Sequence, residues 1–205
     1  MKTIALLTSP SEQPDLTMPV MPTLSFPDSA IVRNGNPVFL PDFDSEFTAI
    51  PYLAVKINRL GKSIAPKFAE RYYSEVTCVM VLTALNLLQT LREAGLPWNA
   101  AVGFDKSLTV GDFFDRDLLG PDSTFDLRYR TVGRHGEVEE QPGISFPIPS
   151  REEIADCINE VSRYNSLKMG DYILVPMSNY SVAVEIDTLV TVDFDGKQIL
   201  KMPVK

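Results

Sequence analysis

A chain of 205 residues that is 44% apolar and 22% charged fits one globular domain with a sizeable core, which excludes a disordered protein. The formal net charge of -8 makes it acidic and argues against nucleic-acid binding, because contacts to phosphates need clustered Lys and Arg side chains. No apolar run reaches the length of a membrane span, and the first apolar patch is too short for a signal peptide. We therefore expect a cytoplasmic protein that binds neither a membrane nor a nucleic acid.

The chain offers few nucleophilic side chains. Cys78 and Cys157 lie far apart and form no Cys-x-x-Cys motif, so we expect two reduced thiols. His135 is the one histidine, and any histidine-dependent catalysis would have to use it. It stands at a predicted hairpin tip, where an exposed turn is the favoured interpretation. The sequence contains no phosphate-binding loop, dinucleotide fingerprint or Gly-x-Ser-x-Gly motif.

The first part of the chain is predicted to be an arm. Its apolar start favours a first β-strand, and six prolines follow before residue 38. Since proline removes a backbone donor and fixes φ, we assign residues 1–37 to an extended N-terminal arm with a short first strand. Residues 38–205 then form a β-rich body. It begins with a strand over 37–40, directly after a turn predicted by Asn34-Gly35.

Two apolar runs flank a short polar helix at the centre of the chain. Residues 50–57 and 76–82 have the composition of buried strands. Residues 61–74 between them are predicted to form a helix with Phe68 and Tyr72 on one face. The rest of the chain is expected to pack against this group of elements.

The C-terminal half is predicted to be mostly strands. A helix should begin at Thr83 or Ala84 and end before Gly95, residues 125–140 favour a hairpin, and Ser150 starts a capping box before a helix over 152–164. Four further strands are predicted over 172–176, 181–185, 189–194 and 198–202, with a hairpin turn at Asp195-Gly196. This element order predicts the α+β fold class.

Two acidic motifs could present oxygen atoms to a cation. They are Asp42, Asp44 and Glu46 in one loop, and Asp112, Asp115 and Asp117 in another. For the first motif the favoured interpretation is a solvated loop, and for the second it is a loop or capping role, with a metal site as the alternative in both. Trp98 and Phe104 are expected to pack in a core rather than to line a binding site.

Several short motifs share an order and spacing along the chain from Leu24 to its last residue. They are Ser29-Ala30, the turn Gly35-Asn36-Pro37, Leu40-Pro41, LAVKINRLGKSI at 53–64, Thr83-Ala84, Gly103-Phe104-Asp105, Gly136-Glu137-Val138 and SLKMGDYI at 166–173. Together they resemble the fumarylacetoacetate hydrolase family. The resemblance implies a single-domain mixed β-sandwich or β-roll with a few peripheral helices, and a homodimer that pairs through the β-rich body.

The resemblance also implies where a site would lie. In the family, three carboxylates hold Mg²⁺ or Mn²⁺, which binds a 2-keto or 2,4-diketo acid and stabilises the enolate that forms. The three ligand positions fall on Ile50, Tyr52 and Val81, an arginine position on Leu85, a lysine position on Val102 and a substrate-binding segment near Ser178. Asp105 alone keeps a carboxylate, and the family's His-Glu pair has no counterpart.

We therefore expect no catalytic residue, no metal and no cofactor at these degenerate pocket positions. The favoured interpretation is a pseudoenzyme of this family with a binding or interaction role, for which a small-molecule carboxylate is an open ligand class. The alternative is a metal-dependent hydrolase or decarboxylase of small 2-keto or 2,4-diketo acids that uses a relocated site. The polarity of the pocket floor discriminates between the two.

Overall fold

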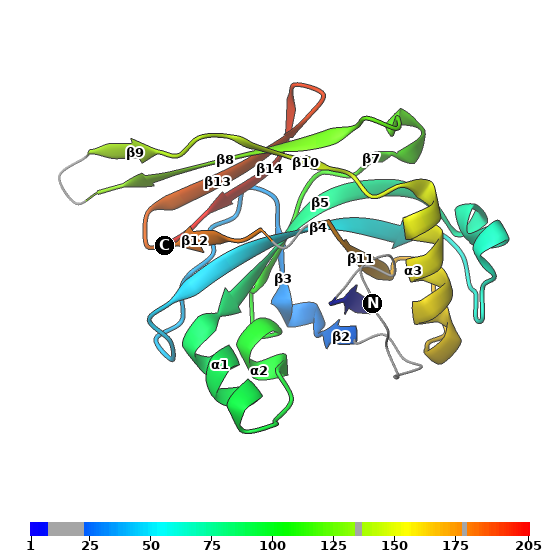
Figure 1. Cartoon of the computed structure of the whole chain (residues 1–205), viewed down its shortest axis with the longest axis horizontal. Coiled ribbons are helices and arrows are strands. Elements are labelled where there is room, and N and C mark those ends of the chain that lie inside the picture. The colour runs from blue at the N-terminus through cyan, green and yellow to red at the C-terminus, as the bar shows by residue number, and fades with distance from the viewer. Residues whose placement is uncertain (8–22, 134–136, 178–179) are drawn as a thin grey trace.

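The computed structural model describes residues 1–7, 23–133, 137–177 and 180–205, which form two β-sheets with a few helices (Figure 1). The strands are β1 (Thr3–Leu6), β2 (Thr23–Phe26), β3 (Ile31–Arg33), β4 (Phe47–Ile57), β5 (Tyr73–Ala84), β6 (Leu108–Val110), β7 (Phe114–Asp115), β8 (Thr124–Val132), β9 (Val138–Glu140), β10 (Ile144–Pro147), β11 (Tyr172–Pro176), β12 (Val182–Val184), β13 (Thr188–Phe194) and β14 (Lys197–Pro203). The α-helices are α1 (Leu85–Glu93), α2 (Asn99–Val102) and α3 (Arg151–Tyr164), and the 3-10 helices are η2 (Asp28–Ala30), η3 (Pro66–Tyr72) and η4 (Arg116–Leu118). In these ranges no helix is long and apolar enough to cross a membrane.

The large sheet is built on the antiparallel pair of β4 and β5. Its strand order is β2-β1-β11-β4-β5-β6-β3, with β12 beside β4 and β7 beside β5. Both central strands are buried on both faces along most of their length. A strand of this kind has a nearly continuous apolar sequence rather than an alternating one, which is why these two runs could be predicted as strands.

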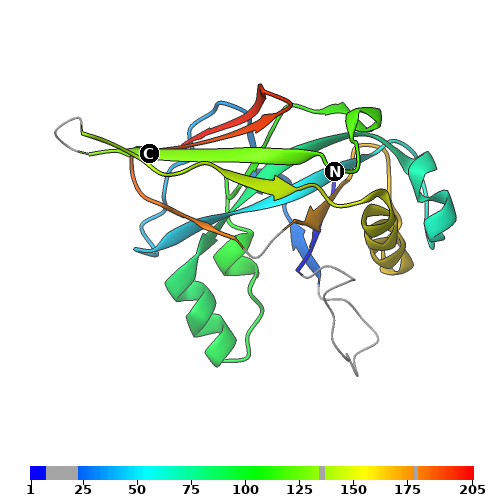
Figure 2. The same cartoon turned by 45° about the horizontal axis from the view of Figure 1, so that its top comes forward.

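The small sheet has the order β10-β8-β13-β14, with β9 beside β8. Strand β13 alternates buried and half-buried residues, because one face packs on the core and the other faces outward. The predicted turn at Asp195-Gly196 is confirmed, since both residues have positive φ and join β13 to β14. Figures 1 and 2 show this sheet lying across one face of the large sheet.

The helices lie on different sides of the large sheet. Ser150 and Glu153 form the predicted capping box at the start of α3, which buries Ile154, Ile158 and Val161 against the main core. The pair α1 and α2 lies on the face of the large sheet that points away from the small sheet (Figure 2). A second, smaller cluster of buried residues occupies that face, and Phe26, Tyr52 and Val81 belong to it.

Three predicted elements differ from the observed ones. Residues 61–74 form no α-helix: only η3 is helical, and its three residues per turn do not place Phe68 and Tyr72 on one face. The expected strand over 37–40 is reduced to a single bridge between Val38 and Val204. The helix predicted to begin at Thr83 or Ala84 starts at Leu85. Both residues still belong to β5, because β4 begins earlier than the predicted strand over 50–57 and pairs with them.

The described part of the N-terminal segment joins the large sheet. The predicted first strand is confirmed as β1, which pairs with β11 in parallel and with β2 antiparallel. Strand β3 pairs with β6. Residues 8–22, which carry several of the prolines, lie outside the described residues, and the division at residue 37 stays a prediction.

Asp171 fastens β1 to the rest of the sheet. Its side chain is buried, and its Oδ1 accepts a hydrogen bond of 2.8 Å from the backbone N of Lys2. Its Oδ2 accepts a bond of the same length from the backbone N of Lys168 and lies 3.6 Å from the Lys2 ammonium. The Gly-Asp motif, which supported the family resemblance, therefore has a structural role here.

We predict that Asp171→Ala lowers the free energy of unfolding by about 2–4 kcal/mol, because two backbone N–H groups lose a charged acceptor. Asp171→Asn keeps one acceptor oxygen and should lose less. Urea unfolding measures both variants, and Asp122→Ala, at an exposed aspartate, serves as the control. An Asp171→Ala variant as stable as this control would contradict the structural role.

Candidate functional site

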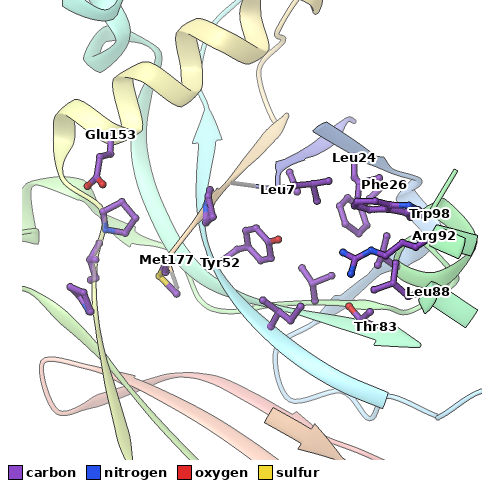
Figure 3. Close-up of a pocket in the computed structure, with 18 residues that line it drawn as sticks. Leu7, Leu24, Phe26, Tyr52, Thr83, Leu88, Arg92, Trp98, Glu153 and Met177 are labelled. Carbon is purple, nitrogen blue, oxygen red and sulfur yellow. The ribbon is translucent and has the colours of Figure 1, made fainter. Parts of the chain in front are cut away.

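A cavity of about 340 Å³ lies on the face of the large sheet that carries α1 and α2 (Figure 3). Its floor comes from β4 and β5, and its sides come from β1, β2, α1, α2 and the segment between β10 and α3. The lining residues are Ala5, Leu7, Leu24, Phe26, Ile50, Tyr52, Val81, Thr83, Leu88, Arg92, Trp98, Val102, Pro147, Ile148, Pro149, Glu153, Pro176 and Met177. The volume suits a small organic molecule.

Four of the pocket positions assigned from the sequence lie on the wall of this cavity. They are Ile50, Tyr52, Val81 and Val102. The other three do not join them: Leu85 is the first residue of α1 and does not line the cavity, Asp105 is exposed and also outside it, and Ser178 lies outside the described residues.

The floor of the cavity is made of hydrocarbon at the point where a metal ligand is implied. Ile50 and Val81 lie directly opposite each other in the register of β4 and β5. Val81 is only 3% exposed and belongs to the smaller core, and the hydroxyl groups that line the cavity from these two strands come from Tyr52 and Thr83 instead. The side chains of Ile50 and Val81 can pack against the apolar surface of a ligand. They have no lone pair with which to coordinate a metal ion.

The cavity residues do not fit a divalent cation. Mg²⁺ and Mn²⁺ take several hard oxygen ligands, usually including carboxylates. Among the described residues, Glu153 is the one carboxylate that lines the cavity, and its Oε2 already accepts a hydrogen bond of 2.8 Å from the backbone N of Ser150. Over all the residues that the structure describes, no three His, Cys, Asp or Glu side chains come together in a way that could hold an ion.

The polar groups of the cavity are residues that sequence reasoning did not select for this role, apart from Tyr52. The hydroxyl of Tyr52 points into the cavity (Figure 3). Burial raises the pKa of Tyr52 to about 12, so its phenol is protonated at neutral pH and acts as a hydrogen-bond donor. Thr83 and Arg92 also line the cavity; Thr83 belongs to the Thr83-Ala84 motif of the resemblance but was not assigned to the pocket, and Arg92 belongs to no motif that the sequence analysis identified.

Arg92 and Trp98 form a stacked pair on the side of the cavity. The Cζ atom of Arg92 lies 4.4 Å from the centre of the Trp98 ring. Helix α1 carries the arginine, and the loop before α2 carries the tryptophan, so the contact joins the two helices. Trp98, which we expected to be a core residue, lines the cavity instead.

Asp44 holds the helix that carries Arg92. Helix α1 begins after Ala84, whose side chain cannot cap it. The Oδ2 atom of Asp44 accepts a hydrogen bond of 2.9 Å from the backbone N of Leu87, and Oδ1 accepts bonds from Asn86 and from the backbone of its own loop. This motif was expected to be a solvated loop, whereas Asp44 is half-buried, caps α1 and has both carboxylate oxygens engaged.

The second acidic motif has a similar role. Asp115 caps η4 by accepting a bond of 2.8 Å from the backbone N of Asp117, and Asp117 pairs with Arg116 and Arg151.

The two thiols form no disulfide, as predicted, and both are buried. Burial raises the pKa of both Cys78 and Cys157, which disfavours the thiolate that a nucleophile needs. His135 lies outside the described residues.

Comparison with known proteins assigns this fold. The chain is 23% identical to the mitochondrial oxaloacetate tautomerase FAHD1 of Rattus norvegicus over 179 residues, which are 87% of this chain and 78% of that protein. A crystal structure of a putative fumarylacetoacetate hydrolase family protein from Yersinia pestis superposes with a TM-score of 0.77 at 19% identity, covering 100% of this chain and 92% of that one. The chain is thus similar in sequence to the FAHD1 oxaloacetate tautomerase and similar in fold to solved structures described as fumarylacetoacetate hydrolase-family proteins. No protein-family model matches it.

One structure with a similar fold contains a metal ion. The fumarylpyruvate hydrolase of Pseudomonas aeruginosa, solved in complex with Mn²⁺ and pyruvate, superposes with a TM-score of 0.75 at 18% identity and covers 99% of this chain and 88% of that one. The predicted FAH-like fold of the present chain, mostly β-sheet with few helices in a single domain, is thereby confirmed.

The cap on α1 makes a pH-dependent prediction. Burial alone would raise the pKa of Asp44, but the hydrogen bonds from Leu87, Glu46, Asn86 and Ser45 outweigh it and lower that pKa. The stabilisation is therefore complete above the unfolded pKa of about 3.9 and is lost as the pH falls through the lower folded value. We expect Asp44→Asn to be about 1 kcal/mol less stable than the natural chain at pH 7, and this difference should shrink below about pH 4.

Urea unfolding between neutral and acid pH measures this difference. Asp42→Asn is the matched control, because Asp42 is exposed and its side chain makes no hydrogen bond to the part of the chain that the structure describes. A difference for Asp44→Asn that stays constant at all pH values would contradict the capping role of the charged carboxylate.

Proposed function

We propose that this chain is a fumarylacetoacetate hydrolase-family protein that binds a small molecule without a metal ion and does not catalyse a reaction on it. One observation carries the proposal. The positions that the resemblance assigns to metal ligands, Ile50, Tyr52 and Val81, lie together on one cavity wall and bear no carboxylate. The cavity itself is retained, with a volume and lining suited to a ligand.

The cavity also lacks a group that could move a proton from carbon. Cleavage or tautomerisation of a keto acid needs a base within reach of the substrate and a charge that stabilises the enolate. Of the side chains that line the cavity, Tyr52 is protonated at neutral pH, Arg92 is a cation and Glu153 belongs to the capping box of α3. A binding role therefore suits these residues better than acid–base chemistry.

The alternative of a relocated metal site receives no support from the residues that would have to form it. Asp44 uses both carboxylate oxygens to hold its own loop and α1. Asp115 caps η4, and Asp105 is exposed outside the cavity. We therefore keep the non-catalytic binding role as the proposal.

A homodimer remains part of the proposal on the strength of the family resemblance. Strands β9 and β10 together form one edge of the small sheet beside β8, and exposed strand edges favour pairing or cover by another chain. Light scattering at micromolar concentration should give the mass of two chains. A monomer mass in moderate salt would contradict the dimer.

We predict that isothermal titration calorimetry detects no Mg²⁺ or Mn²⁺ binding tighter than about 1 mM, because Ile50 and Val81 cannot replace the hydration of the ion. Oxaloacetate and fumarylpyruvate should also show no turnover above background with either metal. Sub-millimolar metal binding that Asp105→Ala abolishes, or metal-dependent turnover that follows the protein through purification, would overturn the proposed function.

A further inference from the structure

The cavity concentrates hydrogen-bond donors on the side of α1. The guanidinium of Arg92 points into the cavity (Figure 3), and its Cζ lies over the Trp98 ring. Among the described residues no carboxylate forms an ion pair with it. A guanidinium that lies over an aromatic ring, with its N–H edges unused, is suited to bind a carboxylate through two parallel hydrogen bonds.

Thr83 is the second feature of the cavity that favours a ligand, because its buried hydroxyl has no hydrogen-bond partner among the described residues. Its side chain is 1% exposed. Thr83 lines the same cavity as Arg92 (Figure 3). A buried hydroxyl without a partner costs free energy, and the oxygen of a ligand that enters here would provide that partner.

The remaining walls restrict what the ligand can be. Leu24, Phe26, Val81 and Val102 present hydrocarbon, which favours an apolar ligand body. Figure 3 shows Glu153 on the opposite side of the cavity from Arg92, so a second negative charge on the ligand would approach a carboxylate. One cation and one facing anion therefore favour a ligand with a single negative charge.

We propose that the cavity binds a small apolar monocarboxylic acid, whose carboxylate pairs with Arg92 beside Thr83 and whose body packs against Phe26 and Val81. This inference rests on the proposed metal-free binding role. It also departs from keto-acid recognition, because a carboxylate bound by Arg92 needs no neighbouring keto group to chelate a cation. Phenylacetate and 4-methylpentanoate have this chemistry, whereas oxaloacetate carries two carboxylates.

Trp98 gives a direct readout, because it is the only tryptophan of the chain and lines the cavity. The experiment titrates phenylacetate and 4-methylpentanoate into the whole protein in the presence of EDTA and follows Trp98 fluorescence. We expect a saturable change with at least one acid below about 10 mM, the range in which a specific millimolar site fills. Phenylacetamide and oxaloacetate should bind at least about tenfold more weakly, since one lacks the charge and the other carries a second.

Two variants test the anion contact. Arg92→Gln should weaken phenylacetate binding by about tenfold or more, through loss of the charge. Arg71→Gln is the matched control, because Arg71 is also exposed and stacked on an aromatic ring, that of Phe68 at 4.9 Å, but lies outside the cavity. It should leave the affinity unchanged, and circular dichroism should show that both variants are folded.

Thr83→Val separates a ligand contact from a structural role. Valine has nearly the shape of threonine and removes an unpaired buried hydroxyl, so the free protein should be as stable as the natural chain or more so. The affinity for phenylacetate should nevertheless fall by several fold. A variant that is less stable in urea and binds phenylacetate unchanged would contradict the role of Thr83.

The outcomes separate this inference from the proposed function. No saturable signal with either acid, or equal binding of phenylacetate and phenylacetamide, would overturn the monocarboxylate site while leaving metal-free binding intact. Binding that appears only when Mg²⁺ or Mn²⁺ replaces EDTA would overturn both. Metal-free binding that weakens in Arg92→Gln but not in Arg71→Gln would support the site.

Discussion

The structure depends on the antiparallel pairing of β4 and β5. These strands run together from Phe47 opposite Ala84 to Ile57 opposite Tyr73, and every other strand of the large sheet is added beside them. Side chains alternate across a strand, so one set of residues fills the core under the small sheet and the other set forms the cavity floor. The register that builds the core therefore also fixes which residues face a ligand, and a shift of one residue would exchange the two sets.

One side of the cavity is formed by α1, which is held in place by residues distant in the sequence. Helix α1 buries none of its residues fully and receives its N-terminal cap from Asp44, 43 positions before Leu87. Its last turn carries Arg92, which rests on Trp98 from the next helix. The charged end of the cavity thus depends on a loop carboxylate and an aromatic ring rather than on the core of the sheet. Helix α1, rather than the sheet, therefore sets the charge at this end of the site.

The sequence was a good guide wherever one chemical signal decided the structure. The capping box at Ser150, the Asp195-Gly196 turn and the apolar runs of β4 and β5 each need only local residues. The sequence predicted less well those segments whose structure depends on pairing with a distant strand. Thr83 and Ala84 continue β5 because β4 extends to meet them, and the segment before β5 forms a 3-10 helix because the chain must be extended again by Tyr73.

Only part of the cavity lining could be predicted from the sequence. The resemblance located Ile50, Tyr52, Val81 and Val102 on what is one cavity wall. Arg92 could not be found in the same way, because its position depends on the approach of α1 to Trp98, and the Thr83-Ala84 motif gave no sign that the Thr83 hydroxyl has no partner among the described residues. Asp105, chosen because it kept a carboxylate, shows that a matching residue type does not place a side chain in a pocket.

The facing pair of Ile50 and Val81 has an evolutionary consequence. A metal site in this cavity would need carboxylates on both strands, and mutation supplies them one at a time. The first would be an uncompensated charge among buried apolar neighbours, which destabilises a protein by several kcal/mol before any ion can bind. Because stability falls at the intermediate step, selection would remove that intermediate. An apolar pair at Ile50 and Val81 would therefore oppose a stepwise gain of metal ligands at these two positions.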